Sequence, residues 1–152
     1  MTGASGEKGL PAGKEAEIRA SFARQGMMRA AGATIAALEP GRCVIELPFS
    51  DAVSQQGGFF HGGMIGALGD SAGGYAAMSL LPVGAEVLTL DYKVDFLRPA
   101  AGARLFAEGS VLRAGRLVSV TRVDVHVETA DGRHVLCAAL QQSIIRAPDP
   151  AS

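Results

Sequence analysis

Residues 61–79 read HGGMIGALGDSAGGYAAMS, and this run constrains the architecture more than any other part of the chain. Eleven of the sixteen residues from Gly62 to Ala77 are Gly, Ala or Ser. Each glycine costs an isolated helix about 1 kcal/mol relative to alanine, so a helix here needs tertiary support. Because small side chains let a backbone lie close against its neighbours, the run predicts a long central helix packed tightly on a sheet.

Strand-like segments flank this helix on both sides. Two precede it and four follow it: 33–38, 42–49, 86–97, 103–113, 117–129 and 133–146. Apolar and polar residues alternate between Leu88 and Phe96, which is typical of a strand with one face on the core. Short connections such as Asp131-Gly132 leave no room for crossover helices, so we expect an antiparallel sheet.

These segments predict an α+β fold, in which a curved antiparallel sheet of five or six strands wraps around the central helix. A first amphipathic helix is expected over residues 14–30. Residues 1–14 and 147–152 carry no periodic pattern and are expected to be flexible tails, which leaves 15–146 as a single domain.

Composition excludes several classes of protein. The 152 residues carry 14 Lys+Arg against 15 Asp+Glu, which gives no general attraction to nucleic acid or to an anionic membrane. The longest weakly charged stretch, residues 52–85, is interrupted by Asp70 and by many glycines, so no membrane span is expected. The two cysteines form no CxxC pair and no apolar leader is visible at the N-terminus, so we expect a reduced, cytoplasmic protein.

Asp70 is the only formally charged residue between Asp51 and Glu86. A carboxylate in the middle of an apolar helix carries a desolvation cost unless it is paired or hydrogen-bonded. No basic residue lies nearby in sequence. We therefore interpret Asp70 as a catalytic nucleophile or general base, and a purely structural hydrogen bond to the backbone is the alternative.

The approach to the helix, QQGGFFHGG at residues 55–63, is rich in glycine. Exposed backbone N–H groups in a first helical turn, aided by the helix dipole, suit an oxyanion or a carbonyl oxygen. Gly62 and Gly63 permit a close approach to such a group. His61 is either a structural hydrogen-bonding residue or a catalyst, and the whole segment could also be a tight loop without a chemical role.

Two further motifs point to other chemistry. Residues 69–73, GDSAG, fit the G-x-S-x-G nucleophile elbow of serine hydrolases. An elbow needs a strand directly before its serine, here Ser71, and a helix is predicted there instead. His126 and His134 flank a hairpin turn, but without paired carboxylates or a CxxC they predict no metal site.

Taken together, these residues resemble a known family. Gln55, His61-Gly62-Gly63, Asp70 nine positions after the histidine, and LDYKVDFLRPA at 90–100 are similar to the hotdog-fold acyl-CoA thioesterases of the phenylacetate-degradation (PaaI-like) type. The resemblance covers residues 33–146. It implies a helix wrapped by an antiparallel sheet, and hydrolysis of a CoA thioester at a dimer interface, often within a tetramer, with no metal or organic cofactor.

The resemblance also implies catalytic roles. Asp70 matches the catalytic carboxylate, and Gly62 matches the residue whose backbone N–H polarises the thioester carbonyl. Gln55 falls where the family has an amide that assists the oxyanion or the water. His61 supports this loop, and Thr89 falls where some members have a hydroxyl that orients the water.

Substrate contacts are expected around the start of the helix and at the first of five arginines between residues 98 and 122. Arginine suits the phosphates of CoA geometrically. The candidate substrate-binding residues are Phe59, Phe60, Gly63, Met64 and Arg98. The acyl group itself, whether aryl or a short or medium chain, stays open.

Helix geometry indicates a shared site. Gly62 and Asp70 are eight residues apart, so on one straight helix they stand about 12 Å apart and cannot both touch one carbonyl. If both act on it, they come from antiparallel helices of a twofold dimer. We expect an acyl-CoA substrate and a homodimer or a dimer of dimers. A non-hydrolytic acyl-CoA-binding module and an enoyl-CoA hydratase or dehydratase using His61 are the alternatives.

Overall fold

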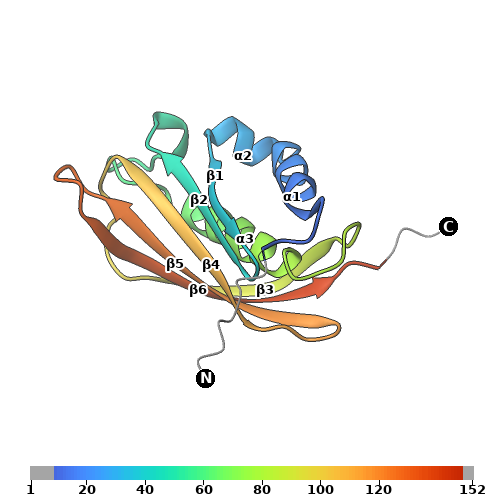
Figure 1. Ribbon diagram of the computed structural model, residues 1–152. Coiled ribbons are helices and arrows are strands. Elements are labelled where there is room, and N and C mark those ends of the chain that lie inside the picture. The colour runs from blue at the N-terminus through green and yellow to red at the C-terminus, as the bar shows by residue number, and fades with distance from the viewer. Residues whose placement is uncertain (1–8, 149–152) are drawn as a thin grey trace, which may run out of the picture.

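The computed structural model describes residues 9–148 and contains six strands and three α-helices in that range (Figure 1). In chain order the elements are α1 (Lys14–Ala23), α2 (Gly26–Ala31), β1 (Thr34–Glu39), β2 (Arg42–Pro48), the short 3-10 helix η1 (Asp51–Val53), α3 (Gly62–Met78), β3 (Val87–Phe96), β4 (Arg104–Arg113), β5 (Val118–Glu128) and β6 (His134–Arg146). The predicted strands and the predicted central helix are confirmed to within one or two residues at each end.

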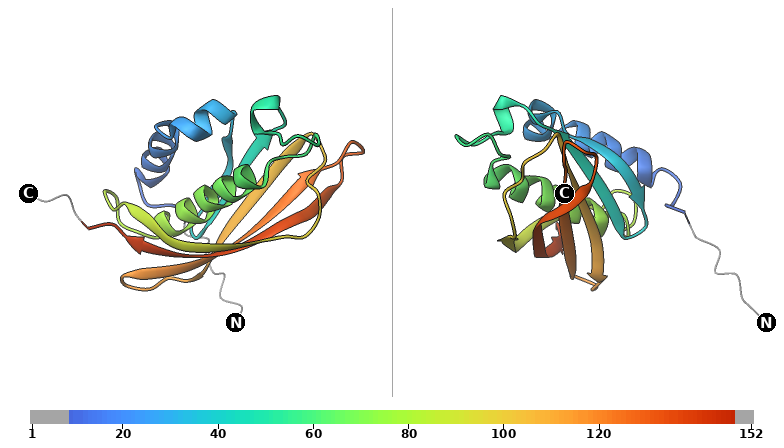
Figure 2. Two further views of the ribbon diagram at one scale, coloured as in Figure 1. Left: turned by 180° about the vertical axis from the view of Figure 1, so that it is seen from behind. Right: turned by 90° about the vertical axis from the view of Figure 1, so that its left-hand side faces the viewer.

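The strands form one curved sheet in the order β1-β2-β4-β5-β6-β3, and every neighbouring pair is antiparallel. Helix α3 lies along the concave face and packs against β2, β3, β4, β5 and β6. Figure 2 shows the sheet curling around α3, with β3 at one edge beside β6. The α+β architecture expected from the sequence is therefore confirmed.

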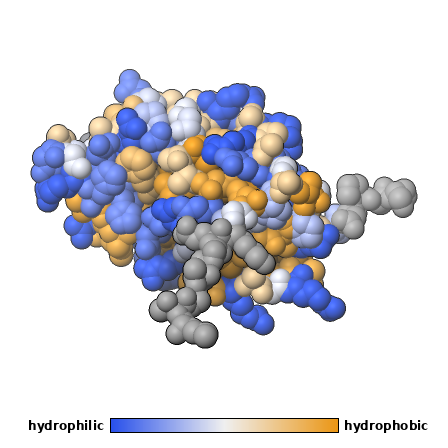
Figure 3. All heavy atoms as spheres, viewed as in Figure 1, coloured by the Kyte–Doolittle hydropathy of each residue, from blue (hydrophilic) through white to orange (hydrophobic). Residues whose placement is uncertain are grey.

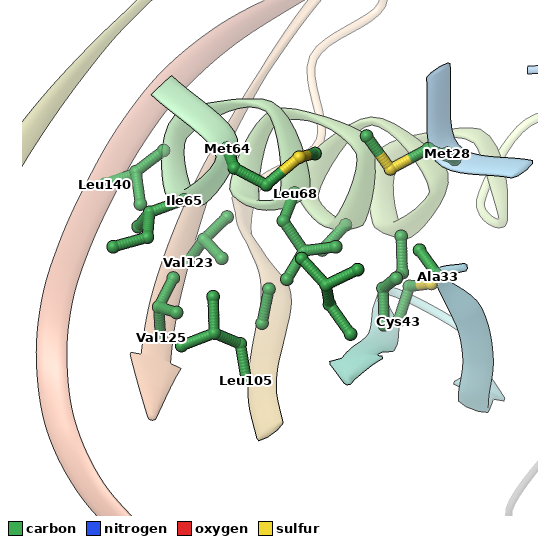
Figure 4. Close-up of a cluster of buried hydrophobic side chains, with 14 of the residues drawn as sticks. Met28, Ala33, Cys43, Met64, Ile65, Leu68, Leu105, Val123, Val125 and Leu140 are labelled. Atoms are coloured by element: carbon green, nitrogen blue, oxygen red, sulfur yellow. The ribbon is translucent and has the colours of Figure 1, made fainter. Parts of the chain in front are cut away.

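The main core lies between α3 and the sheet. Met64, Ile65 and Leu68 point from the helix toward apolar side chains of the strands, including Leu105 and Val123 (Figure 4). All of these side chains are buried. Burial of such side chains stabilises the fold by roughly 1.5–3 kcal/mol each, which supports a helix whose own propensity is low.

Glycine allows the helix and the sheet to approach closely. A Cβ added to Gly109 of β4 would lie 2.6 Å from the carbonyl carbon of Ala72 and 2.7 Å from the backbone nitrogen of Gly73. A Cβ added to Gly69 would lie 2.7 Å from a methyl carbon of Leu140. The small residues of α3 thus meet a glycine on the sheet, as the sequence of the helix led us to expect.

Gly109→Ala is expected to destabilise the protein by about 1–3 kcal/mol, because the new methyl group would press on backbone atoms of α3 that cannot rotate away. Urea unfolding followed by circular dichroism measures this loss. Gly74→Ala is the matched control, since a Cβ at Gly74 meets nothing within 4 Å. It should raise the free energy of unfolding by about 0.5–1 kcal/mol. Equal effects of the two variants would contradict this account of the packing.

The edge strand β3 does not keep the predicted alternation. The register shifts between Thr89 and Asp91, which is a β-bulge that leaves Leu90 without a partner in the register. Val94 still packs on the core, but Leu88 and Leu90, which the alternation placed in the core, are 60% and 56% exposed. The bulge reverses which side chains face α3 over the first part of the strand.

The N-terminal helix is also interrupted. A single helix was expected over residues 14–30, but Gln25 is extended, with φ −72° and ψ 100°, and separates α1 from α2. The Gln25 side chain turns toward α3, where its Nε2 donates to the Tyr75 hydroxyl at 2.9 Å. This tertiary contact explains a break that helix propensity does not predict.

At the start of α1, Lys14 is buried, and its Nζ donates to Glu17 at 2.9 Å and to the Pro82 carbonyl at 3.0 Å. The expectation of flexible tails concerns mainly residues 1–8 and 149–152, which lie outside the described residues.

None of the helices formed by residues 9–148 is both long enough and apolar enough to cross a membrane. On the face drawn in Figure 3, hydrophilic side chains surround an apolar area near the middle.

Candidate active site

The start of α3 presents a free backbone amide. His61 is the N-cap residue, and its Nδ1 accepts a hydrogen bond from the Gly63 N–H at 2.8 Å. The loop before it is held by the His61 N–H, which donates to the Val53 carbonyl at 2.9 Å. Within residues 9–148, the Gly62 N–H has no hydrogen-bond acceptor. The helix therefore begins with one amide capped by imidazole and its neighbour left available to a ligand.

Asp70, two turns further along α3, is half-buried and is held by two donors. The Thr89 hydroxyl of β3 donates to Asp70 Oδ1 at 2.6 Å. Gln142 Nε2 of β6 donates to the same oxygen at 3.1 Å and to the Asp70 carbonyl at 3.3 Å. No group of the described residues donates to Asp70 Oδ2, so one oxygen is anchored and the other is free.

The β3 bulge is what aims Thr89 at Asp70. Thr89 is opposite Ile144 and Asp91 is opposite Ser143, so Leu90 is the extra residue between them. Strict alternation would place Thr89 on the face opposite to Tyr92. Because of the additional residue, the side chains of Thr89 and Tyr92 both face α3. The position of Tyr92 is shown by its hydroxyl, which lies 3.1 Å from where a Cβ added to Gly66 of α3 would be.

A cavity of about 360 Å³ opens beside Asp70 and Thr89, between α3, β3 and the junction of α1 with α2. Its wall carries a hydrogen-bonded chain of polar side chains. Ser71 Oγ donates to Gln25 Oε1 at 3.2 Å, Gln25 Nε2 donates to the Tyr75 hydroxyl, and that hydroxyl lies 3.1 Å from Ser21 Oγ. Burial raises the pKa of Tyr75, so this hydroxyl stays protonated at neutral pH.

The structure brings together some of the predicted site residues and not others. Asp70 and Thr89 are in direct contact, whereas Gln55 and His61 lie near the start of α3 and Gly62 is its first residue. The Gln55 side-chain oxygen Oε1 accepts a hydrogen bond from the Gly57 N–H. The group around Gly62 at the start of α3 and the group around Asp70 in its middle are thus separated along one helix.

The predicted substrate contacts do not line the Asp70 cavity within one chain. Phe60 and Met64 are buried, and the Phe60 ring packs edge-on against Phe49 at 5.1 Å. Phe59 is half-buried, and Gly63 and Arg98 are exposed. The substrate-binding roles of these five residues stay predictions, and they would require a site formed by two chains.

Other nucleophiles are poorly placed. Ser71 lies inside the continuous helix α3, with no strand before it, so residues 69–73 do not form a nucleophile elbow. Burial raises the pKa of Cys43 to about 12 and that of Cys137 to about 11, so neither is a thiolate at neutral pH. No group of three or more potential metal ligands occurs among residues 9–148.

Gln142 is the functional candidate that the sequence analysis missed. A signal for it exists, because Leu140, Gln142 and Ile144 alternate with residues of the opposite face on β6, so the periodicity places a polar side chain in the core. Gln25 and Tyr75 were also missed as partners across the cavity. Their contact depends on the helix break, for which the sequence carries no clear signal.

Comparison with known proteins shows the family to which this fold belongs. Residues 57–132 match the profile of the thioesterase superfamily. A thioesterase family protein of Silicibacter pomeroyi has the same fold, with a TM-score of 0.85 and 38% identity over 88% of this chain and 98% of that one. The phenylacetic acid degradation protein PaaI of Thermus thermophilus is 29% identical, with a TM-score of 0.67, over 80% of this chain and 98% of that one.

A curated relative adds a named activity. The medium/long-chain acyl-CoA thioesterase YigI of Escherichia coli is 36% identical over 81 residues, which are 45% of this chain and 52% of that protein. This chain therefore matches about half of that relative's length.

Proposed function

Because this chain belongs to the thioesterase superfamily, we propose that it hydrolyses acyl-CoA thioesters with Asp70 as the reacting carboxylate. The observation that carries the proposal is the arrangement around Asp70. Thr89 and Gln142 hold Oδ1, and Oδ2 is unoccupied beside a cavity of about 360 Å³. A half-buried carboxylate with one free oxygen next to a cavity suits nucleophilic or general-base chemistry.

In the general-base route, Asp70 Oδ2 takes a proton from water as the water oxygen attacks the thioester carbonyl carbon. The carbonyl oxygen becomes an oxyanion that accepts a hydrogen bond from the Gly62 N–H of the partner chain. The C–S bond then breaks, the CoA sulfur leaves and is protonated, and the acyl group is released as the acid. In the nucleophilic route Oδ2 attacks first, CoA leaves from an acyl-aspartyl anhydride, and water hydrolyses that anhydride.

Pairing of two chains supplies the second half of the site. Gly62 and Asp70 are the first and ninth residues of one α3, about 12 Å apart along its axis. Within residues 9–148, the edge strand β3 has no strand beyond it in the sheet and exposes apolar side chains on both of its faces. Tyr92 and Phe96 lie on the α3 side, Leu88 lies on the other side, and Leu90 is the bulged residue between them. Pairing of two β3 edges would cover these side chains and set two α3 helices antiparallel across a twofold axis.

Leu90→Arg is expected to convert the dimer to a monomer and to lower hydrolysis by roughly a hundredfold or more, because it places a charge in the proposed apolar interface. Analytical ultracentrifugation and a thiol-release assay measure the two effects. Leu112→Arg is the matched control, since Leu112 on β4 has the same 56% exposure as Leu90. A monomeric Leu90→Arg protein with full activity would contradict the shared site.

The cavity beside Asp70 suits an aryl group or a short to medium acyl chain. Its wall combines the apolar side chains of Met27, Met28 and Met78 with the polar chain of Gln25 and Tyr75. A thiol-release screen against aryl-, short-chain and long-chain CoA esters tests both the activity and this preference. Release of free CoA from at least one class is expected.

The same screen separates the alternatives. Tight binding of acyl-CoA without release of thiol would indicate a binding module instead of an enzyme. Hydration of an enoyl-CoA, detected by loss of its conjugated absorbance without thiol release, would indicate a hydratase. The absence of any histidine hydrogen-bonded to Asp70 among the described residues disfavours the hydratase.

A further inference from the structure

Gln142 is a polar side chain that takes no part in the bond-making steps of the proposed mechanism and that the fold buries almost completely. It lies on β6, is 1% exposed, and its amide is aimed at Asp70. Its Nε2 is within hydrogen-bond distance of both Asp70 Oδ1 and the Asp70 carbonyl. Both of these atoms are acceptors, so the NH2 group must face them, because a flipped amide would set its oxygen against two others.

The other end of this amide is not stabilised. Gln142 Oε1 is buried and has no hydrogen-bond partner within the described part of the chain, and the same holds for Thr121 Oγ1 on β5, directly opposite in the register. A buried acceptor without a donor lowers stability. A residue chosen for packing would be apolar here, so the cost points to a role for its NH2 group.

The helix makes room for this side chain. A Cβ added to Gly73 of α3 would overlap Gln142 Oε1 and lie 2.7 Å from Thr121 Oγ1. Gly73 lies three residues after Asp70, so the turn of α3 that carries the carboxylate is shaped around the glutamine. Gly73 and Gln142 therefore act as a matched pair.

We propose that Gln142 is a positioning residue that, together with Thr89, fixes Asp70 Oδ1 and so directs Oδ2 toward the thioester. This inference rests on the proposed function. Two donors on one carboxylate oxygen restrict rotation of the group. Gln142 donates to Oδ1 and not to the attacking Oδ2, and it acts through Asp70 alone.

The test uses two substitutions of Gln142 that change its hydrogen-bond donor in different ways. Gln142→Met removes the donor with little change of volume, and Gln142→Glu replaces it by a group that donates only when protonated. Gln141→Met is the control, because Gln141 is the exposed neighbour on the other face of β6. kcat and KM for thiol release are measured for all three between pH 5 and pH 8, with urea unfolding in parallel.

For Gln142→Met, kcat is expected to fall by roughly 10- to 100-fold with KM nearly unchanged, because the carboxylate is no longer held in place. For Gln142→Glu, kcat/KM relative to wild type should increase as the pH falls, because only the protonated acid can donate to Asp70. Tyr75 and Glu86, which also line the cavity, are unchanged in every variant, so their titration cancels in the ratios.

A Gln142→Glu ratio that does not change with pH, or Gln142 variants as active as Gln141→Met, would overturn the positioning role. Equal losses of kcat and stability without a pH effect would show that the residue is merely structural. If wild type releases no thiol from any ester, the proposed function fails instead. If wild type is active and Asp70→Asn is not, while the Gln142 variants resemble wild type, only this inference fails. Gly73→Ala provides a second route, because it should displace the glutamine and reproduce the loss of kcat expected for Gln142→Met.

Discussion

Asp70→Asn should release CoA about 10³-fold more slowly than wild type, because asparagine neither attacks a thioester nor accepts a proton at neutral pH. The fold should survive this change. The asparagine carbonyl oxygen can occupy the position of Oδ1 and accept from Thr89 and Gln142, as the carboxylate does. We therefore expect the urea midpoint to stay near that of wild type and KM for the ester to change little.

Ser71→Ala is the natural comparison for Asp70→Asn. Ser71 is the next residue of α3, lines the same cavity and would be the nucleophile of a serine hydrolase. The Ser71→Ala variant loses only a hydrogen bond to Gln25, so most of its thiol-release activity should persist. A folded Asp70→Asn protein with full activity, or a Ser71→Ala protein with none, would exclude the carboxylate mechanism.

A mixture of two inactive variants is expected to recover activity if the site is shared. Gly62→Pro removes the amide that should polarise the carbonyl, and proline is well tolerated as the first residue of a helix. His61 already has the extended conformation, φ −67° and ψ 134°, that a following proline requires. The new ring meets the Phe96 ring, whose nearest atom is 3.0 Å from the added Cβ and whose side chain is exposed and free to move.

In a mixed dimer, the Asp70→Asn chain still supplies Gly62 and the Gly62→Pro chain still supplies Asp70. One of the two sites is then intact, so random assortment should restore about a quarter of wild-type turnover per chain, and the purified mixed dimer should reach about half. Co-expression with two different tags followed by purification of the mixed dimer measures the second value. Gly62→Ala is the control for bulk, since it adds a Cβ but keeps the N–H, and it should lose much less activity than Gly62→Pro.

No recovery in a verified mixed dimer would mean that both groups act within one chain, or that Gly62 does not act at all. The two single variants distinguish these cases. If Gly62→Pro alone is as active as wild type, the amide has no role in catalysis. If it is inactive and the mixed dimer is inactive too, the twofold site is wrong.

The sequence predicts the parts of this fold that local patterns control. The glycine-rich run at 61–79 identified α3, because only tertiary support explains so poor a helix. The hairpin turns and apolar alternation identified the remaining strands and their antiparallel pairing. Asp70 was found in the same way, as an isolated charge in an apolar helix, and the structure gives it two hydrogen-bond donors.

The features that the sequence did not predict are those that depend on distant contacts. The bulge at Leu90 is a property of how β3 pairs with β6, and it alone brings Thr89 to the helix side of the sheet. The break at Gln25 depends on a tyrosine fifty residues later in the chain. A family resemblance could suggest a role for Thr89, but residue periodicity assigned it to the wrong face.

The weak intrinsic propensity of α3 has a consequence for how the enzyme matures. Most of the contacts that support this helix come from strands β4, β5 and β6, all of which follow it in the chain. A nascent polypeptide that has emerged only as far as residue 80 therefore has nothing to anchor Asp70, and Gln142 lies close to the C-terminal end. Hydrolytic competence should thus arrive late in biosynthesis, after the last strand has joined the sheet, so that truncated products remain inert.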